Sequence, residues 1–157
     1  MAGVRTEEEI KEILEKRFGT ILSNWVIQRK RRIYVDVPRE NLVEVVGFAR
    51  RELGFDHLGT ITGLDGGEYL EFLYHLSNQG LLLSLRTKAP VSDPRVQTIL
   101  HLFPGAEPYE RELEDMLGAK VEGLPPGRHY PLPDDWPQGQ HPLKKNWKVS
   151  DAYPAEV

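Results

Sequence analysis

The chain has 157 residues, of which 39% are hydrophobic and 28% are charged, a composition usual for one folded domain. Its formal net charge of −4 gives no general reason to expect nucleic acid or an anionic membrane as a partner. The absence of cysteine excludes disulfides, a cysteine nucleophile and thiolate ligands for zinc or iron–sulfur clusters. No window approaches the roughly 20 apolar residues that span a bilayer, and the N-terminus is too acidic for a signal peptide. We therefore expect an intracellular protein that reaches a membrane only through a partner.

The N-terminal third of the chain predicts a helix, a hairpin and a second helix. Thr6 and Glu9 form a capping-box pattern, and apolar residues follow them at helical spacing. Residues 25–37, WVIQRKRRIYVDV, predict a hairpin because apolar and polar residues alternate in their second half. Residues 42–53 then place their apolar side chains on one face of a helix, which Gly54 is expected to end.

The middle of the chain predicts three strands and then a helix. Residues 57–64 alternate with a period of two and are followed by a DGG turn. The next two strands are predicted to pair across the turn SNQG, residues 77–80, with Leu70, Phe72, Tyr74 and Leu76 on one face. Asp93 before Pro94 predicts the start of a further helix, with an apolar face made of Val96, Ile99, Leu100 and Phe103.

This order of elements predicts an α+β fold, with helices packed on a mainly antiparallel sheet and followed by an extended proline-rich C-terminal arm. Three of the prolines lie in residues 1–103 and nine in residues 104–157. Proline interrupts helices and central strands, so the last part of the chain is expected to be extended. We place a compact domain at residues 1–122 and the arm at residues 123–157.

The usual catalytic and nucleic-acid signals are weak. The five histidines are scattered without the spacing of metal ligands, and no nucleotide-binding or nucleophile-elbow motif occurs. Residues 28–32, QRKRR, form the one basic cluster. Long cations in a hairpin usually cap a turn or protect a strand edge, so we favour this reading over nucleic-acid binding. Contact with an acidic protein neighbour is a further alternative.

Residues 107–123, EPYERELEDMLGAKVEG, predict a short helix that ends at Gly118. Its spacing places Tyr109, Leu113, Met116 and Leu117 on a buried face. A charged stripe adjoins this face, with Arg111 and Asp115 spaced to form an ion pair. The stripe consists of Arg111, Glu112 and Asp115, and Glu110 and Glu114 lie on the opposite flank. From spacing alone, a solvated helix face is favoured over catalytic carboxylates.

Two motifs nevertheless resemble a known family. ERELEDMLG, residues 110–118, is similar to the E-R-E-x-x-D-(M/L)-x-G signature of the respiratory complex I 30 kDa subunit family. LPDDWPQGQHPLKKNW, residues 132–147, resembles that family's second motif, with Lys144 and Asn146 in place of arginine and aspartate. The short chain also resembles the corresponding subunits of membrane-bound [NiFe]-hydrogenases and archaeal sulfur-reducing complexes.

The resemblance implies a non-catalytic peripheral-arm subunit of a complex I-like, ion-translocating membrane oxidoreductase. It implies no cofactor on this chain, and [4Fe–4S] clusters and a NiFe centre as candidate groups of its partners. Those partners are a large [NiFe]-hydrogenase-like subunit of the 49 kDa type and a [4Fe–4S] small subunit, with the membrane arm attached indirectly. The chain would then lie peripherally on the cytoplasmic side of the membrane in a hetero-oligomer without nucleic acid. Its arm from about Pro125 onward is expected to be poorly ordered in isolation.

The resemblance also implies a partner interface on the acidic helix and on the second motif. Its residues are Glu110, Arg111, Glu112, Asp115, Gly118, Pro142, Leu143, Lys144, Lys145 and Trp147. Two alternatives stay open at this stage. One is a small enzyme that uses Glu110, Glu112 or Asp115 as a general acid or base. The other is a nucleic-acid-binding module that uses residues 29–32.

Overall fold

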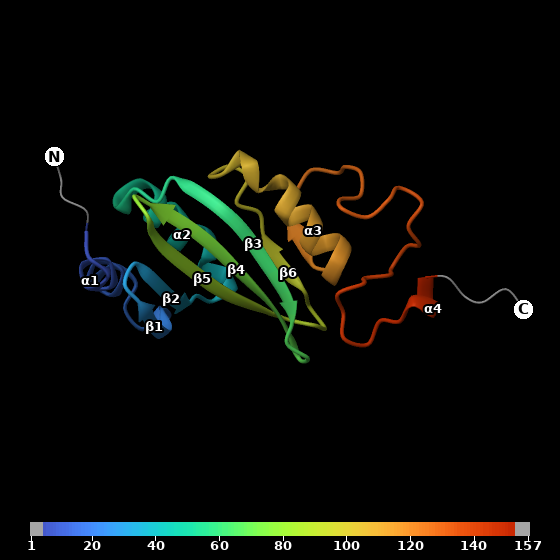
Figure 1. Cartoon of the computed structure of the whole chain (residues 1–157), viewed down its shortest axis with the longest axis horizontal. Coiled ribbons are helices and arrows are strands. Elements are labelled where there is room, and N and C mark those ends of the chain that lie inside the picture. Colours follow the sequence, from blue (N-terminus) through green and yellow to red (C-terminus); the bar gives the residue numbers. More distant parts are fainter. Residues whose placement is uncertain (1–4, 153–157) are drawn as a thin grey trace, which may run out of the picture.

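Five strands form one mixed sheet in the computed structural model, which describes residues 5–152 (Figure 1). The ends of the predicted domain and arm, residues 1–4 and 153–157, lie outside the described residues. The strand order is β1-β2-β5-β4-β3, and every neighbouring pair is antiparallel except β2 and β5. The strands are β1 Ser23–Arg29, β2 Arg32–Asp36, β3 His57–Asp65, β4 Tyr69–Asn78 and β5 Leu81–Pro90. The predicted α+β class is confirmed.

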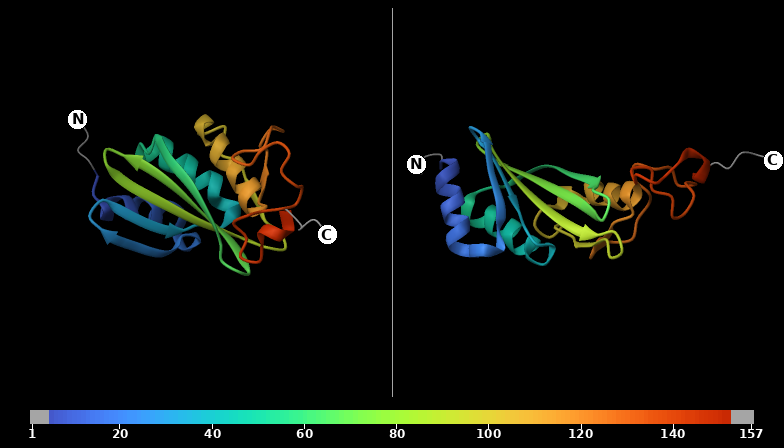
Figure 2. Two further views of the ribbon diagram at one scale, coloured as in Figure 1. Left: turned by 45° about the vertical axis from the view of Figure 1, so that its right-hand side comes forward. Right: turned by 90° about the horizontal axis from the view of Figure 1, so that it is seen from below.

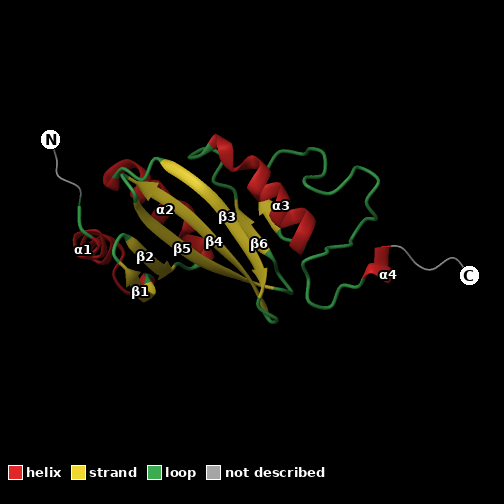
Figure 3. Ribbon diagram, viewed as in Figure 1, coloured by secondary structure: helices red, strands yellow, loops and turns green. Residues whose placement is uncertain are grey.

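Three helices lie on one side of this sheet, as the views in Figure 2 and the colouring in Figure 3 show. Thr6 and Glu9 form the predicted capping box at the start of α1, Glu7–Phe18. The second helix, α2 Leu42–Leu53, ends at Gly54 with a φ of 74°, a left-handed conformation that glycine adopts without strain. The third is α3, Glu107–Leu117. Single-turn helices are η1 Gly19–Ile21, η2 Arg39–Asn41, η3 Pro104–Ala106 and α4 Val149–Ala152.

The core lies between the sheet and these helices. On β4, alternate side chains point into it, and all four residues predicted to share a face are fully buried. Burial of such a side chain contributes about 1.5–3 kcal/mol relative to exposure. The predicted set is therefore confirmed: Leu70, Phe72, Tyr74 and Leu76.

The helix predicted after Asp93 is wrong. Residues 95–97 form a short strand, β6 Arg95–Gln97, which pairs in parallel with β7 Lys120–Glu122. The Asp93 carboxylate accepts hydrogen bonds from the guanidinium groups of Arg95 and Arg39, in that order of effect, and these lower the pKa of Asp93 to about 2. Arg39 also donates to the backbone oxygens of Asp93 and Arg95. Tertiary contacts of this kind override a local helix signal because they bind the backbone groups directly.

α3 packs against β3 at Gly63. A β-carbon added to Gly63 would lie 2.5 Å from Leu117 Cδ1 and 2.6 Å from Leu113 Cδ2. This close approach explains why β3 carries a glycine opposite the apolar face of α3. Beyond β7, the chain continues as irregular structure along the far side of α3 and reaches α4 at the right-hand end of Figure 1.

Candidate partner interface

Glu110, the first glutamate of the family-like motif, is completely buried. One carboxylate oxygen accepts the backbone N–H of Ile99 at 2.7 Å, and the other accepts the Thr98 hydroxyl at 2.6 Å. Burial raises the pKa of Glu110, and these two hydrogen bonds oppose that rise. The side chain therefore joins α3 to the segment after β6 and does not lie on the surface of the described chain.

The spacing predicted an ion pair between Arg111 and Asp115, and this prediction is wrong. Arg111 pairs with Glu107, one turn earlier, at 2.8 Å, and it also donates to the backbone oxygen of Pro125 at 2.9 Å. A β-carbon added to Gly127 would lie 2.5 Å from the guanidinium carbon of Arg111. Arg111 thus holds the start of the arm against the helix, where glycine allows the guanidinium to approach.

Asp115 holds the arm at a second place. Its carboxylate, in a side chain only 10% exposed, lies 2.8 Å from His129 Nδ1 and accepts the backbone N–H of Leu132 at 3.3 Å. Its backbone oxygen lies 2.8 Å from His141 Nδ1. The last carbonyl groups of a helix have no partner within the helix, so the arm completes the C-terminal end of α3.

Two neighbouring contacts extend this attachment. The backbone N–H of Leu143 donates to the backbone oxygen of Met116 at 2.9 Å. The backbone N–H of Lys145 donates to the carboxylate of Asp65, the last residue of β3, at 2.9 Å. Backbone hydrogen bonds, foremost that from Lys145, hold the pKa of Asp65 below its usual range. Gly118, with φ of 72°, faces the His141 ring, so a side chain there would collide with the arm.

Within residues 5–152, Glu112 is the acid of the motif whose side chain binds no other group. Glu107 pairs with Arg111, and Glu114 accepts the backbone N–H of Val121. Glu112 is half-buried, and its side chain makes no hydrogen bond or ion pair with residues 5–152. Its carboxylate is therefore available to a group on another molecule. The carboxylates of Glu110, Glu112 and Asp115 share no hydrogen-bond partner among these residues, so the structure does not assemble them as an acid–base group.

The outer part of the arm is organised by two tryptophans. The rings of Trp136 and Trp147 lie 6.2 Å apart between centroids, and both indole N–H groups donate to Gln140. This loop presents Leu143, which is 50% exposed, and the next turn presents Val149, which is 66% exposed. Of the remaining predicted interface residues, Pro142 and Lys144 are half-buried and Lys145 is exposed.

The basic cluster lies at the opposite end of the molecule from the arm. Arg31 donates to the backbone oxygen of Gln79 and Arg32 to that of Gly80, so these two side chains join the β1–β2 turn to the β4–β5 turn. Arg29 and Lys30 are exposed. The arrangement fits a turn beside the edge strand β1, without aromatic side chains interleaved among the cations of residues 29–32.

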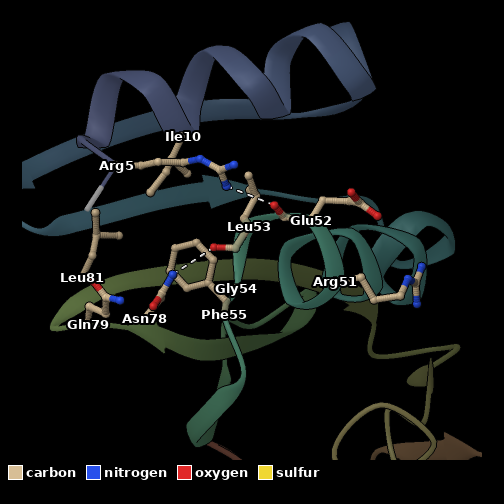
Figure 4. Close-up of a pocket in the computed structure, with 10 residues that line it drawn as sticks. All are labelled: Arg5, Ile10, Arg51, Glu52, Leu53, Gly54, Phe55, Asn78, Gln79 and Leu81. Carbon is tan, nitrogen blue, oxygen red and sulfur yellow. Dashed lines mark hydrogen bonds between the residues drawn. The ribbon is translucent and has the colours of Figure 1, made fainter. Parts of the chain in front are cut away.

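A hollow of about 300 Å³ lies near this end, between the start of α1 and the end of α2 (Figure 4). The Arg5 side chain donates a hydrogen bond to the backbone oxygen of Glu52, and the Asn78 side chain donates one to that of Leu53. Both polar side chains in the hollow therefore bind the backbone of this chain. Within residues 5–152, no three histidine, cysteine, aspartate or glutamate side chains gather as metal ligands. Over the same residues, no helix is both long and apolar enough to cross a membrane.

The sequence did not predict the residues that form hydrogen bonds with α3 and with the arm. Thr98, His129, His141 and Asp65 bind α3 or the arm, yet they lie outside the two motifs, apart from His141. Their separation from their partners reaches 80 residues for Asp65 and Lys145. The one local signal was glycine at positions 63 and 127, where the backbone is approached closely.

Subunits of redox enzymes are similar to this chain in sequence. It is 29% identical over 143 residues to a subunit of the F(420)H(2) dehydrogenase of Methanosarcina mazei, covering 88% of this chain and 90% of the relative. It is 32% identical over 124 residues to the beta subunit of the membrane-bound hydrogenase of Pyrococcus furiosus. This match covers 76% of this chain and 72% of the relative. A subunit of the NADH-quinone oxidoreductase of Chloroherpeton thalassium is 28% identical over 90% of this chain, which spans only 60% of that relative.

Solved structures and a family profile agree with these relatives. A chain of the archaeal membrane-bound sulfane sulfur reductase matches 94% of this chain and 90% of its own length, with a TM-score of 0.79 and 27% identity. The trypsin-resistant fragment of Nqo5 matches 75% of this chain and 98% of the fragment, with a TM-score of 0.65 and 26% identity. The profile described as respiratory-chain NADH dehydrogenase, 30 Kd subunit, matches residues 35–153. The resemblance seen in the two motifs is confirmed, and the chain belongs to the respiratory-chain NADH dehydrogenase 30 kDa subunit family.

Proposed function

We propose that this chain is a non-catalytic peripheral-arm subunit of a complex I-like, ion-translocating membrane oxidoreductase. Its relatives are subunits of dehydrogenase, hydrogenase and NADH-quinone oxidoreductase complexes, and a similar solved chain belongs to an archaeal respiratory membrane complex. Subunits of this kind function in hetero-oligomers. The membrane attachment we propose is peripheral and runs through the partners, on the cytoplasmic side.

The structural observation that supports this proposal is the Glu112 carboxylate on α3. The other acids of α3 bind groups of their own chain, and among the described residues Glu112 alone is left on the helix that bears the family signature. The Glu112 carboxylate binds no group within residues 5–152, so it is free to meet a cation or N–H group of another protein. We infer that another protein of the complex supplies that group, and that the contact sets the register of docking more than its affinity.

The partners we propose are the large [NiFe]-hydrogenase-like subunit of the 49 kDa type and the small subunit with [4Fe–4S] clusters. Electron transfer, and any NiFe chemistry, would then take place in those subunits. The absence of cysteine supports this division, since this chain offers no thiolate to a cluster. Its own residues would position the partners through α3 and the arm.

Charge reversal at Glu112 tests the proposal. We expect Glu112→Lys to reduce the yield of intact complex, purified through a tag on this chain, while the circular dichroism and melting temperature of the isolated chain stay unchanged. The matched control is Glu12→Lys on α1, which places the same charge change on an exposed helix position. A normal yield of complex from Glu112→Lys would contradict the role given to Glu112. Failure of any other polypeptide to co-purify with the wild-type chain would contradict the proposed function itself.

A further inference from the structure

Residues 136–147, which we call the arm loop, leave and return to nearly the same place. The rings at its two ends, those of Trp136 and Trp147, lie 6.2 Å apart between centroids. No residue of the arm loop belongs to a helix or strand. Compact surface loops of about 6–16 residues whose ends lie close together are Ω-loops, and they are frequently functional. The arm loop has this form.

The backbone of the arm loop does not hold its ends together. Pro137 and Pro142 have no N–H to donate. Among residues 133–147, every backbone hydrogen bond joins two residues three positions apart, and such a bond closes only a single turn. These bonds run from Trp136 to Pro133, from Gln140 to Pro137, from Lys144 to His141 and from Trp147 to Lys144.

The middle of the arm loop is held on the folded domain. The backbone N–H of Leu143 binds Met116 on α3, and that of Lys145 binds Asp65 at the end of β3. These contacts fix the middle segment, but they do not join the residues before it to the residues after it. A further contact is needed to close the loop.

Gln140 supplies this contact. Its backbone oxygen accepts the indole N–H of Trp136 at 2.8 Å, and its side-chain oxygen accepts the indole N–H of Trp147 at 3.0 Å. The bond to Trp147 spans seven residues, whereas the backbone bonds of the loop span three. One half-buried residue thus receives the side chains of both ends.

We propose that Gln140 is the positioning residue of the arm loop and keeps it closed in the free chain. A segment that folds only on binding loses conformational entropy at that moment, and a closed loop loses less. The proline content led us to expect a poorly ordered arm, and the closure through Gln140 argues against this for residues 136–147. The inference rests on the proposed function, because closure before binding matters only to a chain that joins a complex.

Hydrogen exchange of the full isolated chain tests whether the loop is closed without a partner. We expect the amides of residues 140–147 to exchange more slowly in the chain than in a free synthetic peptide of the same sequence. Equal rates would overturn the proposal. Purification of an intact complex from the same wild-type chain would show that the proposed function stands even then.

Substitution of Gln140 separates closure from the contacts that hold the middle of the loop. Gln140→Met keeps the length of the side chain and the backbone oxygen, and it removes the side-chain acceptor of Trp147. We expect exchange at Trp147 to rise roughly fivefold, the change in an opening equilibrium that follows from losing one ordinary hydrogen bond. Wild-type exchange in Gln140→Met would overturn the assignment.

Two further variants show which property of Gln140 matters. The control, Gln138→Met, makes the same change at an exposed position whose side chain forms no hydrogen bond within residues 5–152, and it should exchange like the wild type. Gln140→Glu keeps an oxygen that can accept the Trp147 N–H, so it should restore slow exchange. Fast exchange in Gln140→Glu would show that Gln140 does not act as an acceptor.

The same variants test whether assembly uses the closed loop. We expect recovery of the complex, purified through a tag on this chain, to be several-fold lower for Gln140→Met than for Gln138→Met. Gln140→Glu should restore it. Normal recovery from Gln140→Met, together with fast exchange in its free chain, would show that assembly does not need closure. That result would reject the positioning role of Gln140 and leave the proposed function intact.

Discussion

The folded domain and the arm are stabilised by different kinds of contact. Alternate residues of β2, β4 and β5 are completely buried against the helices. In residues 123–152, Ala152 is the only buried residue, and the rest is held mainly by hydrogen bonds to α3 and to the end of β3. A region without an apolar core opens locally at a small free-energy cost. Substitutions in the sheet should therefore affect folding, and those in the arm should affect attachment and assembly.

α3 connects the two regions because its carboxylates point in different directions. Glu110 turns toward the domain and binds Thr98 and Ile99, whereas Asp115 turns toward the arm and binds His129 and Leu132. The same short motif thus contributes to the domain fold and to the arm attachment. We infer that its order of acids reflects these two internal tasks as well as contact with a partner.

The largest effect is expected in the sheet. Phe72→Ala removes a completely buried ring from β4 and should lower the free energy of unfolding by about 3–5 kcal/mol. Urea unfolding followed by circular dichroism measures this loss. The neighbouring Leu73, half-buried on the opposite face, provides the control, and Leu73→Ala should cost much less. Equal losses at the two positions would show that the buried face is not the one described.

The contact between β3 and α3 should give the next largest effect. Gly63→Ala places a methyl group within 2.6 Å of Leu113 and Leu117, so the helix must shift, at about 1–3 kcal/mol. In Gly59→Ala the new methyl group would lie 3.5 Å from the His75 backbone oxygen, an ordinary contact. We expect Gly59→Ala to unfold close to the wild-type urea midpoint. A smaller loss for Gly63→Ala than for Gly59→Ala would contradict this packing.

A smaller, pH-dependent effect is expected from Glu110. Burial raises its folded pKa above the ordinary value of 4.5, so the folded state holds the proton more tightly than the unfolded state. The stability that Glu110 contributes through its raised pKa is fully present below the unfolded pKa and is lost as pH rises through the folded pKa. Glu110→Gln cannot titrate. The unfolding free energy of the wild type minus that of Glu110→Gln should therefore fall as pH rises from about 4 to about 8, and a rise would refute the assignment.

The sequence predicted the domain better than the site. Period and capping signals located α1, α2, α3 and the five strands, because each depends on neighbouring residues. The helix expected after Asp93 failed because Glu110 and Arg39, distant in sequence, bind the backbone there. The motif identified α3, but spacing could not show that Glu110 faces inward or that Asp115 meets two histidines of the arm. Such contacts depend on tertiary structure and leave no local pattern.

The smallest effect on global stability, and the clearest on the arm, is expected from Asp115→Ala. The substitution removes the carboxylate that binds His129 and Leu132, without disturbing the sheet. We expect the unfolding free energy to fall by about 1 kcal/mol, the usual size of a lost hydrogen bond, because the groups that Asp115 binds lie in the exposed arm and not in the sheet. Tryptic cleavage after Arg128 should become several-fold faster, because cleavage requires the arm to leave α3.

The control for this experiment is Asp135→Ala, at an exposed position that makes no hydrogen bond within the part of the chain the structure describes. Because Asp135 does not bind α3, its loss should leave the cleavage rate at the wild-type value. If all three chains are cleaved equally fast, Asp115 does not hold the arm in the isolated protein. The arm would then become ordered only when a partner binds, and the hydrogen bonds between α3 and the arm would describe the assembled state alone.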